Sequence, residues 1–255
     1  DFSDPNVVDD DAVLARRNVI SSILAATASC MMPRESFASS DERSEVDAEP
    51  TTAGSSSAST APFIVILNVQ TDAKKDDTFE IEIEVRPDWA PLASNRFREL
   101  VENGFYNDSR FFRVLPGYVA QFGIAADPKL NKEWIFCEKN CRALQDEILK
   151  EKNKRGTLSF ASSGKKSRQT QVFINLGNND GPPNFLDAQN FVPFARVIRG
   201  MDDTVKQLNS EYGTLESISG GLAGSVSQGK AAYYGAEYLD AMFPKLSIIK
   251  SAKVI

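Results

Sequence analysis

The sequence predicts a mainly β fold, an antiparallel barrel or sandwich with a few helices. Residues 78–86 alternate strictly between apolar residues and glutamates, and this period of two is typical of a strand with one buried and one wet face. Further short apolar runs separated by turn residues follow up to residue 255, whereas only a few segments show helical spacing. Strands that outnumber helices in this way favour an antiparallel architecture over a parallel α/β sheet.

The expected elements follow from these patterns in chain order. Residues 63–69 and 78–86 predict a hairpin, and helical spacing predicts a helix over 90–103 that Gly104 ends. Two more helices are expected over 200–208 and over 231–243, with a loop rich in glycine and serine over 210–229. The other expected strands cover residues 111–115, 118–124, 156–161, 171–176, 191–198 and 248–255.

Composition excludes several classes of function. The net charge of -6 argues against general nucleic-acid binding, which needs a basic face to neutralise phosphates. The chain contains no histidine, so a Ser-His-Asp triad, a Cys-His pair, a His-ligated zinc ion and a histidine general base are all impossible. Any catalysis must therefore work through arginine, carboxylates, amides, hydroxyls or thiols.

The cysteines give a weak signal. Three are present, and Cys137 and Cys141 have the i,i+4 spacing that would place them on one side of a helix. A regulatory disulfide or a metal clip stays open, but two thiolates alone cannot complete a tetrahedral zinc site. The pattern favours two unrelated thiols, and no cofactor or metal is expected.

Residues 1–38 are predicted to be a targeting segment. Arg16 and Arg17 precede an apolar run, Val19 to Met32, that is too short to span a bilayer core of roughly 20 residues. Ser36-Phe37-Ala38 supplies the small residues of a signal-peptidase site, so a removable signal of the twin-arginine type is expected and the mature form has no transmembrane helix. A short amphipathic core helix is the open alternative.

The destination follows from the residues before the arginines. The chain begins at Asp1 with acidic residues, which resembles the second half of a bipartite plastid presequence and predicts delivery to the thylakoid lumen of a chloroplast. The bacterial periplasm is the alternative. Residues 39–61 are rich in Ser, Thr, Ala and acids and predict a flexible linker, so the folded domain, residues 62–255, is expected to begin near Pro62.

Five blocks in this domain, in order, resemble the cyclophilin family. Residues 111–123, Phe-Phe-Arg-Val-Leu-Pro-Gly-Tyr-Val-Ala-Gln-Phe-Gly, are similar to the cyclophilin pattern Phe-His-Arg-Val-Ile-Pro-Gly-Phe-Met-x-Gln-Gly-Gly. Residues 156–161 resemble Gly-x-Leu-Ser-Met-Ala, and residues 170–174 resemble Ser-Gln-Phe-Phe-Ile. Residues 184–187 resemble the Trp-Leu-Asp turn, and residues 191–201 resemble Val-Phe-Gly-x-Val-x-x-Gly-Met.

The resemblance implies an eight-stranded antiparallel β-barrel capped by helices and a cofactor-free peptidyl-prolyl cis-trans isomerase (rotamase) that assists protein folding as a chaperone. It makes Arg113 the catalytic arginine and Gln121 the glutamine beside it. The residues that it implies for substrate binding are Tyr118, Val119, Phe173 and Leu186 in the proline pocket, Ala161 and Ser162 on the substrate backbone, and Phe185 where many members have tryptophan.

The sequence also departs from the family pattern. The pocket histidine of many cyclophilins has no counterpart, and an extra residue leaves Gln189, Asn190 and Phe191 as candidates for its position. Phe122 and Ile124 replace a glycine and an acidic residue of the family. These changes bear on turnover and on cyclosporin affinity more than on the fold.

The residue types suit amide rotation, because no bond is made or broken and no proton shuttle is needed. A guanidinium that is always charged can donate to the prolyl nitrogen once conjugation is lost, and it does so best in a water-poor pocket. An arginine paired with a carboxylate in the barrel is the alternative for Arg113. The basic cluster Lys165-Lys166-Ser167-Arg168 is interpreted as a solvated turn or as a surface that steers acidic substrates.

Two functions from different classes stay open. The first is an active isomerase whose partners are proline-containing polypeptides. The second is a catalytically weak proline-binding module that acts as an assembly factor or as a subunit of a larger, membrane-associated complex. The departures around the pocket and the long inserts at 127–153 and 210–230 support the second hypothesis as the alternative, while the isomerase is the preferred interpretation.

Overall fold

The structure is a computed structural model that describes residues 61–73, 75–136, 143–215 and 224–255. The predicted targeting segment, the predicted linker up to residue 60, and Cys137 and Cys141 lie outside the described residues. Within the described ranges, no helix is both long enough and apolar enough to cross a membrane.

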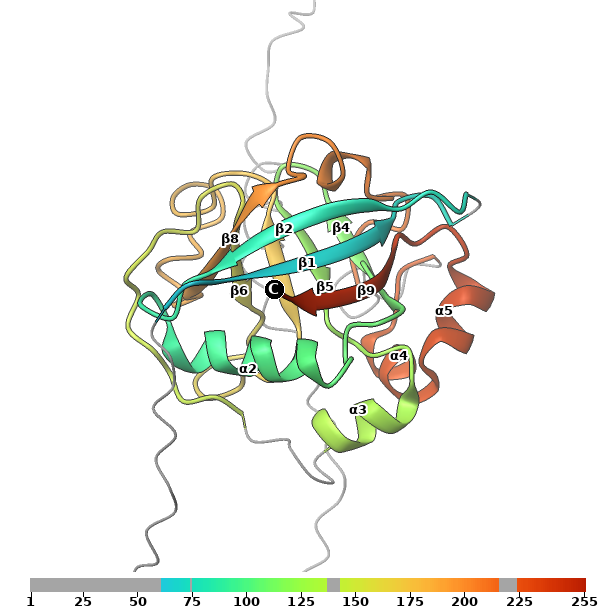
Figure 1. Cartoon of the computed structure of the whole chain (residues 1–255), viewed down its shortest axis with the longest axis horizontal. Helices are drawn as coiled ribbons and strands as arrows, with labels where there is room; N and C mark the ends of the chain where they lie inside the picture. Colours follow the sequence, from blue (N-terminus) through green and yellow to red (C-terminus); the bar gives the residue numbers. More distant parts are fainter. Residues whose placement is uncertain (1–60, 74, 137–142, 216–223) are drawn as a thin grey trace, which may run out of the picture.

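One antiparallel sheet forms the body of the described chain (Figure 1). Its strand order is β3-β9-β1-β2-β8-β6-β7-β5-β4. The strands are β1 Phe63–Gln70, β2 Phe79–Val85, β3 Ser109–Arg110, β4 Arg113–Leu115, β5 Val119–Phe122, β6 Thr157–Phe160, β7 Val172–Asn175, β8 Pro193–Arg199 and β9 Ile248–Val254.

The sheet curls because its two end strands are neighbours in the chain. Only Phe111 and Phe112 separate β3 from β4, so the first and last strands of the sheet must lie close together. This confirms the predicted mainly β, antiparallel fold. The strand that was expected over residues 111–115 begins only at Arg113, because Phe111 and Phe112 form the link between β3 and β4.

The predicted hairpin is confirmed, with β1 and β2 paired from Phe63↔Val85 to Val69↔Phe79. Ile81, Ile83 and Val85 are buried on the inner face, as the alternation predicts. The central core lies inside the curled sheet, where the ring of Phe97 packs 5.1 Å from that of Phe194. Phe97 belongs to α2 (Pro91–Glu102), which lies across one opening of the sheet (Figure 1).

The C-terminal helical region differs from the prediction. The single helix expected over 231–243 is wrong, since α4 (Gln228–Tyr234) and α5 (Ala236–Met242) are separate helices. Gly235 divides them with a φ of 62°, and a Cβ there would lie 2.2 Å from the carbonyl oxygen of Ala126. The helix expected over 200–208 is also wrong and is reduced to one 3-10 turn, η1 (Val205–Gln207). The sequence patterns did not predict α3 (Pro128–Trp134).

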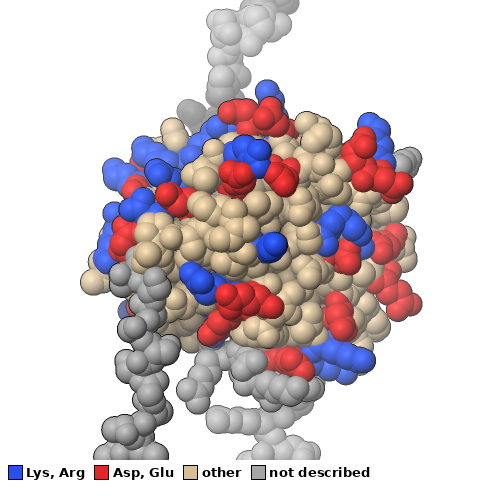
Figure 2. All heavy atoms as spheres, in the orientation of Figure 1, with Lys and Arg blue, Asp and Glu red and all other residues tan. Residues whose placement is uncertain are grey.

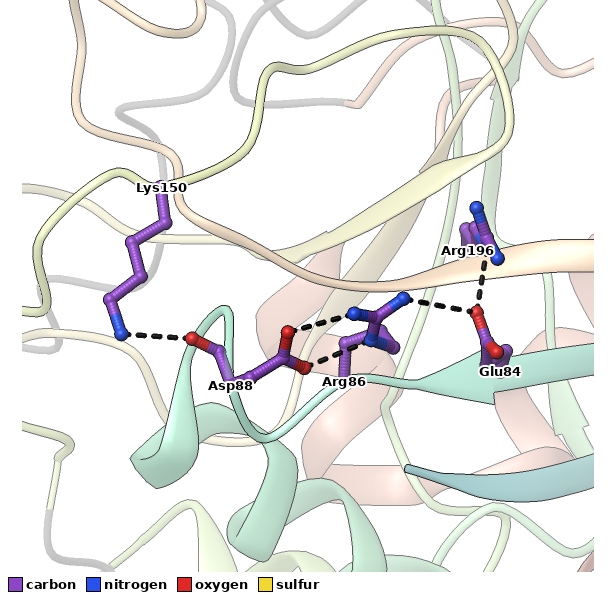
Figure 3. Close-up of polar contacts among 5 residues, drawn as sticks. All are labelled: Glu84, Arg86, Asp88, Lys150 and Arg196. Atoms are coloured by element: carbon purple, nitrogen blue, oxygen red, sulfur yellow. Dashed lines mark hydrogen bonds and ion pairs between the residues drawn. The ribbon is translucent and has the colours of Figure 1, made fainter. Parts of the chain in front are cut away.

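The insert segment 143–153 forms no helix or strand, but hydrogen bonds connect it to the rest of the fold. Leu144 forms an isolated bridge with Arg168, and the Lys150 Nζ donates to the carbonyl oxygen of Asp88 at 2.8 Å (Figure 3). Asp88 accepts two hydrogen bonds from Arg86, at 2.8 and 2.9 Å. The hydrogen bond to Arg86 lowers the pKa of the Asp88 carboxyl from its ordinary value. The network continues to Glu84, which also accepts from Arg196 on β8 at 2.7 Å (Figure 3).

On the face of the molecule that Figure 2 shows, the lysines and arginines lie among aspartates and glutamates. This face therefore presents no continuous basic surface of the kind that phosphate backbones require.

Candidate active site

Strand pairing places three predicted site residues and Ser159 in one row across four strands. Arg113 on β4 pairs with Gln121 on β5, Gln121 pairs with Phe173 on β7, and Phe173 pairs with Ser159 on β6. Directly opposed residues in paired strands point to the same face of the sheet. The intervening residues, such as Val114 and Ala120, belong to the core, so this row lies on the outer face of the barrel.

Arg113 is buried, with 1% of its surface exposed. Its Nη1 donates to the Gln121 Oε1 at 3.1 Å, while Nε and Nη2 have no hydrogen-bond partner. Within the described ranges, no carboxylate forms an ion pair with it, which contradicts the alternative of an ion-paired barrel arginine. Burial lowers the pKa of Arg113 to about 10, so the guanidinium is still charged at neutral pH.

An apolar cluster lies beside the guanidinium. The ring centroid of Tyr118 lies 5.8 Å from the Arg113 Cζ. The Tyr118 hydroxyl is buried without a hydrogen-bond partner, and burial raises the pKa of Tyr118 to about 12. The buried members of this cluster are Tyr118, Val119, Ala161, Phe173, Leu186 and Phe191.

The structure thus brings together most of the residues that the resemblance implied. Of the three candidates for the ambiguous position, Phe191 joins them, with its ring 5.7 Å from that of Phe173 and edge-on to it. Gln189 instead donates to the carbonyl oxygen of Asn184, and Asn190 is exposed. Ser162 follows Ala161 and is half-buried. Phe185 is not part of the cluster and is 47% exposed.

A buried polar network fixes the loop that carries Leu186 and Phe191. The Asn153 amide nitrogen donates to Asp187 at 2.8 Å and to the carbonyl oxygen of Phe191 at 2.7 Å. Its amide oxygen accepts from Ser159 at 2.9 Å and from Asn175 at 3.2 Å. All donors and acceptors of this amide are used. Because Ser159 lies on β6 and Asn175 on β7, Asn153 connects the loop directly to these two strands.

A second chain of contacts fixes the Arg113 end. Gln121 donates to the Gln171 Oε1 at 2.8 Å. Gln171 was not singled out as a site residue, although it stands in the block of residues 170–174 that resembles the family. It also lines a cavity of about 290 Å³ next to Ala161 and the exposed Lys166.

The basic cluster at 165–168 is only partly a surface feature. Lys165 and Lys166 are exposed, but Arg168 is buried and forms an ion pair with Glu147 at 2.9 Å. The interpretation of all three cations as one solvated turn is therefore wrong for Arg168, whose charge is neutralised within the fold.

Comparisons with known proteins identify the family of this chain. Residues 66–219 match the family described as cyclophilin type peptidyl-prolyl cis-trans isomerase/CLD. A peptidyl-prolyl cis-trans isomerase of Acinetobacter baylyi is 34% identical over 152 residues, which cover 56% of this chain and 76% of that protein. The isomerase cypE of Dictyostelium discoideum is 32% identical over 146 residues, covering 56% of this chain and 87% of that protein.

A crystal structure of a cyclophilin type isomerase from Cryptosporidium parvum aligns with a TM-score of 0.49 at 19% identity, over 76% of this chain and 98% of that one. The assignment rests on the family match and on the sequence relatives. On these grounds the chain belongs to the cyclophilin-type peptidyl-prolyl cis-trans isomerase family.

Proposed function

We propose that this chain catalyses the cis-trans isomerisation of X-Pro bonds and thereby assists the folding of proline-containing polypeptides. One observation carries the proposal: Arg113 is a buried guanidinium that keeps two donor nitrogens free of hydrogen-bond partners beside an apolar cluster. A buried charged donor without a partner is costly, and such an arrangement is typical of functional sites rather than of structural ones.

The arrangement suits the chemistry of amide rotation. The barrier is roughly 18–20 kcal/mol because rotation breaks amide conjugation, and uncatalysed exchange takes about 10–100 s. In the twisted amide the prolyl nitrogen regains a lone pair that the free Arg113 donors can bind. The planar ground state offers no such acceptor, so the hydrogen bond favours the transition state over the substrate.

The neighbouring residues hold the reacting groups. The hydrogen bond from Arg113 to Gln121 fixes the plane of the guanidinium. The rings of Phe173 and Phe191 and the side chain of Leu186 provide the apolar wall for the proline ring. Ala161 and Ser162 lie at the end of β6 and are the positions proposed to contact the substrate backbone.

The first test is a protease-coupled isomerase assay on the whole chain and its Arg113→Ala variant. We expect the variant to lose on the order of 10²-fold or more in kcat/KM, the usual effect of removing a donor that acts on the transition state. An Arg196→Ala variant, which removes a surface arginine that pairs with Glu84, is the matched control and should keep the wild-type rate.

Equal rates for the wild type and Arg113→Ala, or no catalysis by either, would contradict the proposal that the chain is an active isomerase. The result would then favour a catalytically weak proline-binding module in a larger, membrane-associated complex.

We further propose that the chain acts in the thylakoid lumen of a plastid, with the bacterial periplasm as the alternative. The support is the sequence of residues 14–38, with Arg16-Arg17 before an apolar run and Ser36-Phe37-Ala38 after it. Amino-terminal sequencing of the native protein should find a start at Ser39. A native protein that retains Arg16 and Arg17 would contradict cleavage after Ala38.

A further inference from the structure

Four side chains form a continuous hydrogen-bonded series that begins at Arg113 and ends at a helix of the C-terminal region. The Arg113 Nη1 donates to the Gln121 Oε1 at 3.1 Å, and the Gln121 Nε2 donates to the Gln171 Oε1 at 2.8 Å. The Gln228 Nε2 donates to the same Gln171 Oε1 at 2.9 Å. Both acceptor positions of the Gln171 oxygen are therefore used.

The direction of every hydrogen bond in this series is set by the arginine. A guanidinium only donates, so Gln121 must turn its oxygen toward Arg113 and its nitrogen toward Gln171. Gln171 must then present its oxygen to Gln121. A group that approaches that oxygen from the other side must be a donor, and Gln228 supplies it.

Gln228 is well placed to act as a fixed anchor. It is the first residue of α4, and the side chain of Ser227 caps this helix by accepting from the Lys230 backbone nitrogen at 3.5 Å. The chain is also tied to the body of the protein just past α4, because the nitrogen of Ala236, the first residue of α5, donates to the Ala126 carbonyl oxygen at 2.9 Å. Gln228 also lies beyond residue 219, where the match to the family ends.

We propose that Gln228 is a positioning residue for the isomerase reaction, which holds the Gln171 and Gln121 amides in the orientation that aims the free donors of Arg113 at the substrate. The proposal rests on the proposed function of Arg113. Gln228 belongs to the insert at residues 210–230. It would act on the reaction through Gln171 and Gln121 and not by contacting the substrate.

The test is Gln228→Glu in the whole chain. A carboxylate would face the Gln171 oxygen, and relief of this repulsion requires Gln171 and then Gln121 to flip, which would turn a donor toward Arg113. We expect kcat to fall by about three- to ten-fold, the range of one hydrogen bond, while KM changes by less than about two-fold. The isosteric Gln228→Met, which removes the donor without reversing the series, should have a smaller effect.

Two controls separate this role from a structural one. Lys230→Gln makes the same change in charge on the same helix at an exposed side chain, and it should leave kcat unchanged. In a Gln171→Leu background Gln228→Glu should cause no further loss, because the series is already interrupted. A similar factor in that background, or a wild-type kcat in Gln228→Glu, would overturn the proposal.

A readout that does not depend on activity keeps the two proposals apart. The side-chain amide NMR signals of Gln121 and Gln171 should shift in Gln228→Glu and stay in place in Lys230→Gln. If the wild type is no faster than Arg113→Ala, the proposed function fails, and Gln228 has no reaction to position. If the wild type is active and these signals do not move, the positioning role alone is rejected.

Discussion

Replacing Arg113 with methionine is expected to make the protein more stable while it removes the proposed activity. The pKa of about 10, against an ordinary value of 12.5, means that the folded state holds this charge poorly. The difference corresponds to about 3 kcal/mol of destabilisation at neutral pH. Methionine is apolar and fills irregular space, so we expect the free energy of unfolding to rise by about 1–3 kcal/mol.

The gain in stability should depend on pH. Below about pH 10 Arg113 is charged in both states, so the wild type carries the full cost of burying the charge. As the pH rises through that value the folded state releases the proton before the unfolded state does, and this cost disappears. The advantage of Arg113→Met should therefore be largest near neutral pH and shrink as the pH rises past about 10.

Urea unfolding of the whole chain near pH 7, repeated at higher pH, would measure this difference. Arg168→Met is the matched control, because Arg168 is also buried but is paired with Glu147. It should lower the stability, since the carboxylate of Glu147 would be left buried without its counter-ion. Lower stability in both variants would show that Arg113 is a structural residue and would contradict its proposed role.

Glu147→Gln is expected to destabilise the fold by about 3 kcal/mol, the usual cost of breaking a buried ion pair. The Glu147 side chain is 7% exposed and binds Arg168 at 2.9 Å. Its two oxygens also accept from the backbone nitrogens of Leu92 at 2.7 Å and Ala93 at 3.2 Å. These nitrogens open α2, whose own N-cap residue, Ala90, has no side chain that can accept.

A glutamine at this position would remove the negative charge. Its NH₂ group would face the donors that Glu147 now binds, namely the Leu92 and Ala93 nitrogens and the Arg168 guanidinium. Urea unfolding monitored by circular dichroism would measure the loss. Glu102→Gln, at the other end of α2, removes only an exposed pair with Arg98 at 4.0 Å and should cost less than about 1 kcal/mol. An equally small loss in Glu147→Gln would contradict the view that the 143–153 insert stabilises α2.

The sequence alone was sufficient for elements with a clear local pattern. The alternation over residues 78–86 and the helical spacing before Gly104 were correct, because the period of apolar residues is a property of neighbouring residues. The local pattern failed at Gly235, where a close approach to the Ala126 oxygen divides the predicted helix. It also gave no sign of the Glu147 cap, which joins residues 55 positions apart.

In the candidate site, too, some properties follow from the sequence and others only from the tertiary structure. The motif around Arg113 and Gln121 and the absence of histidine determined the kind of chemistry and the residues that could perform it. Only the tertiary structure decided that Arg113 is buried without a carboxylate partner, that Phe191 packs in the apolar cluster, and that Gln228 reaches Gln171. Residue type sets what a side chain can donate or accept, whereas burial and partners depend on contacts between distant segments that no local pattern encodes.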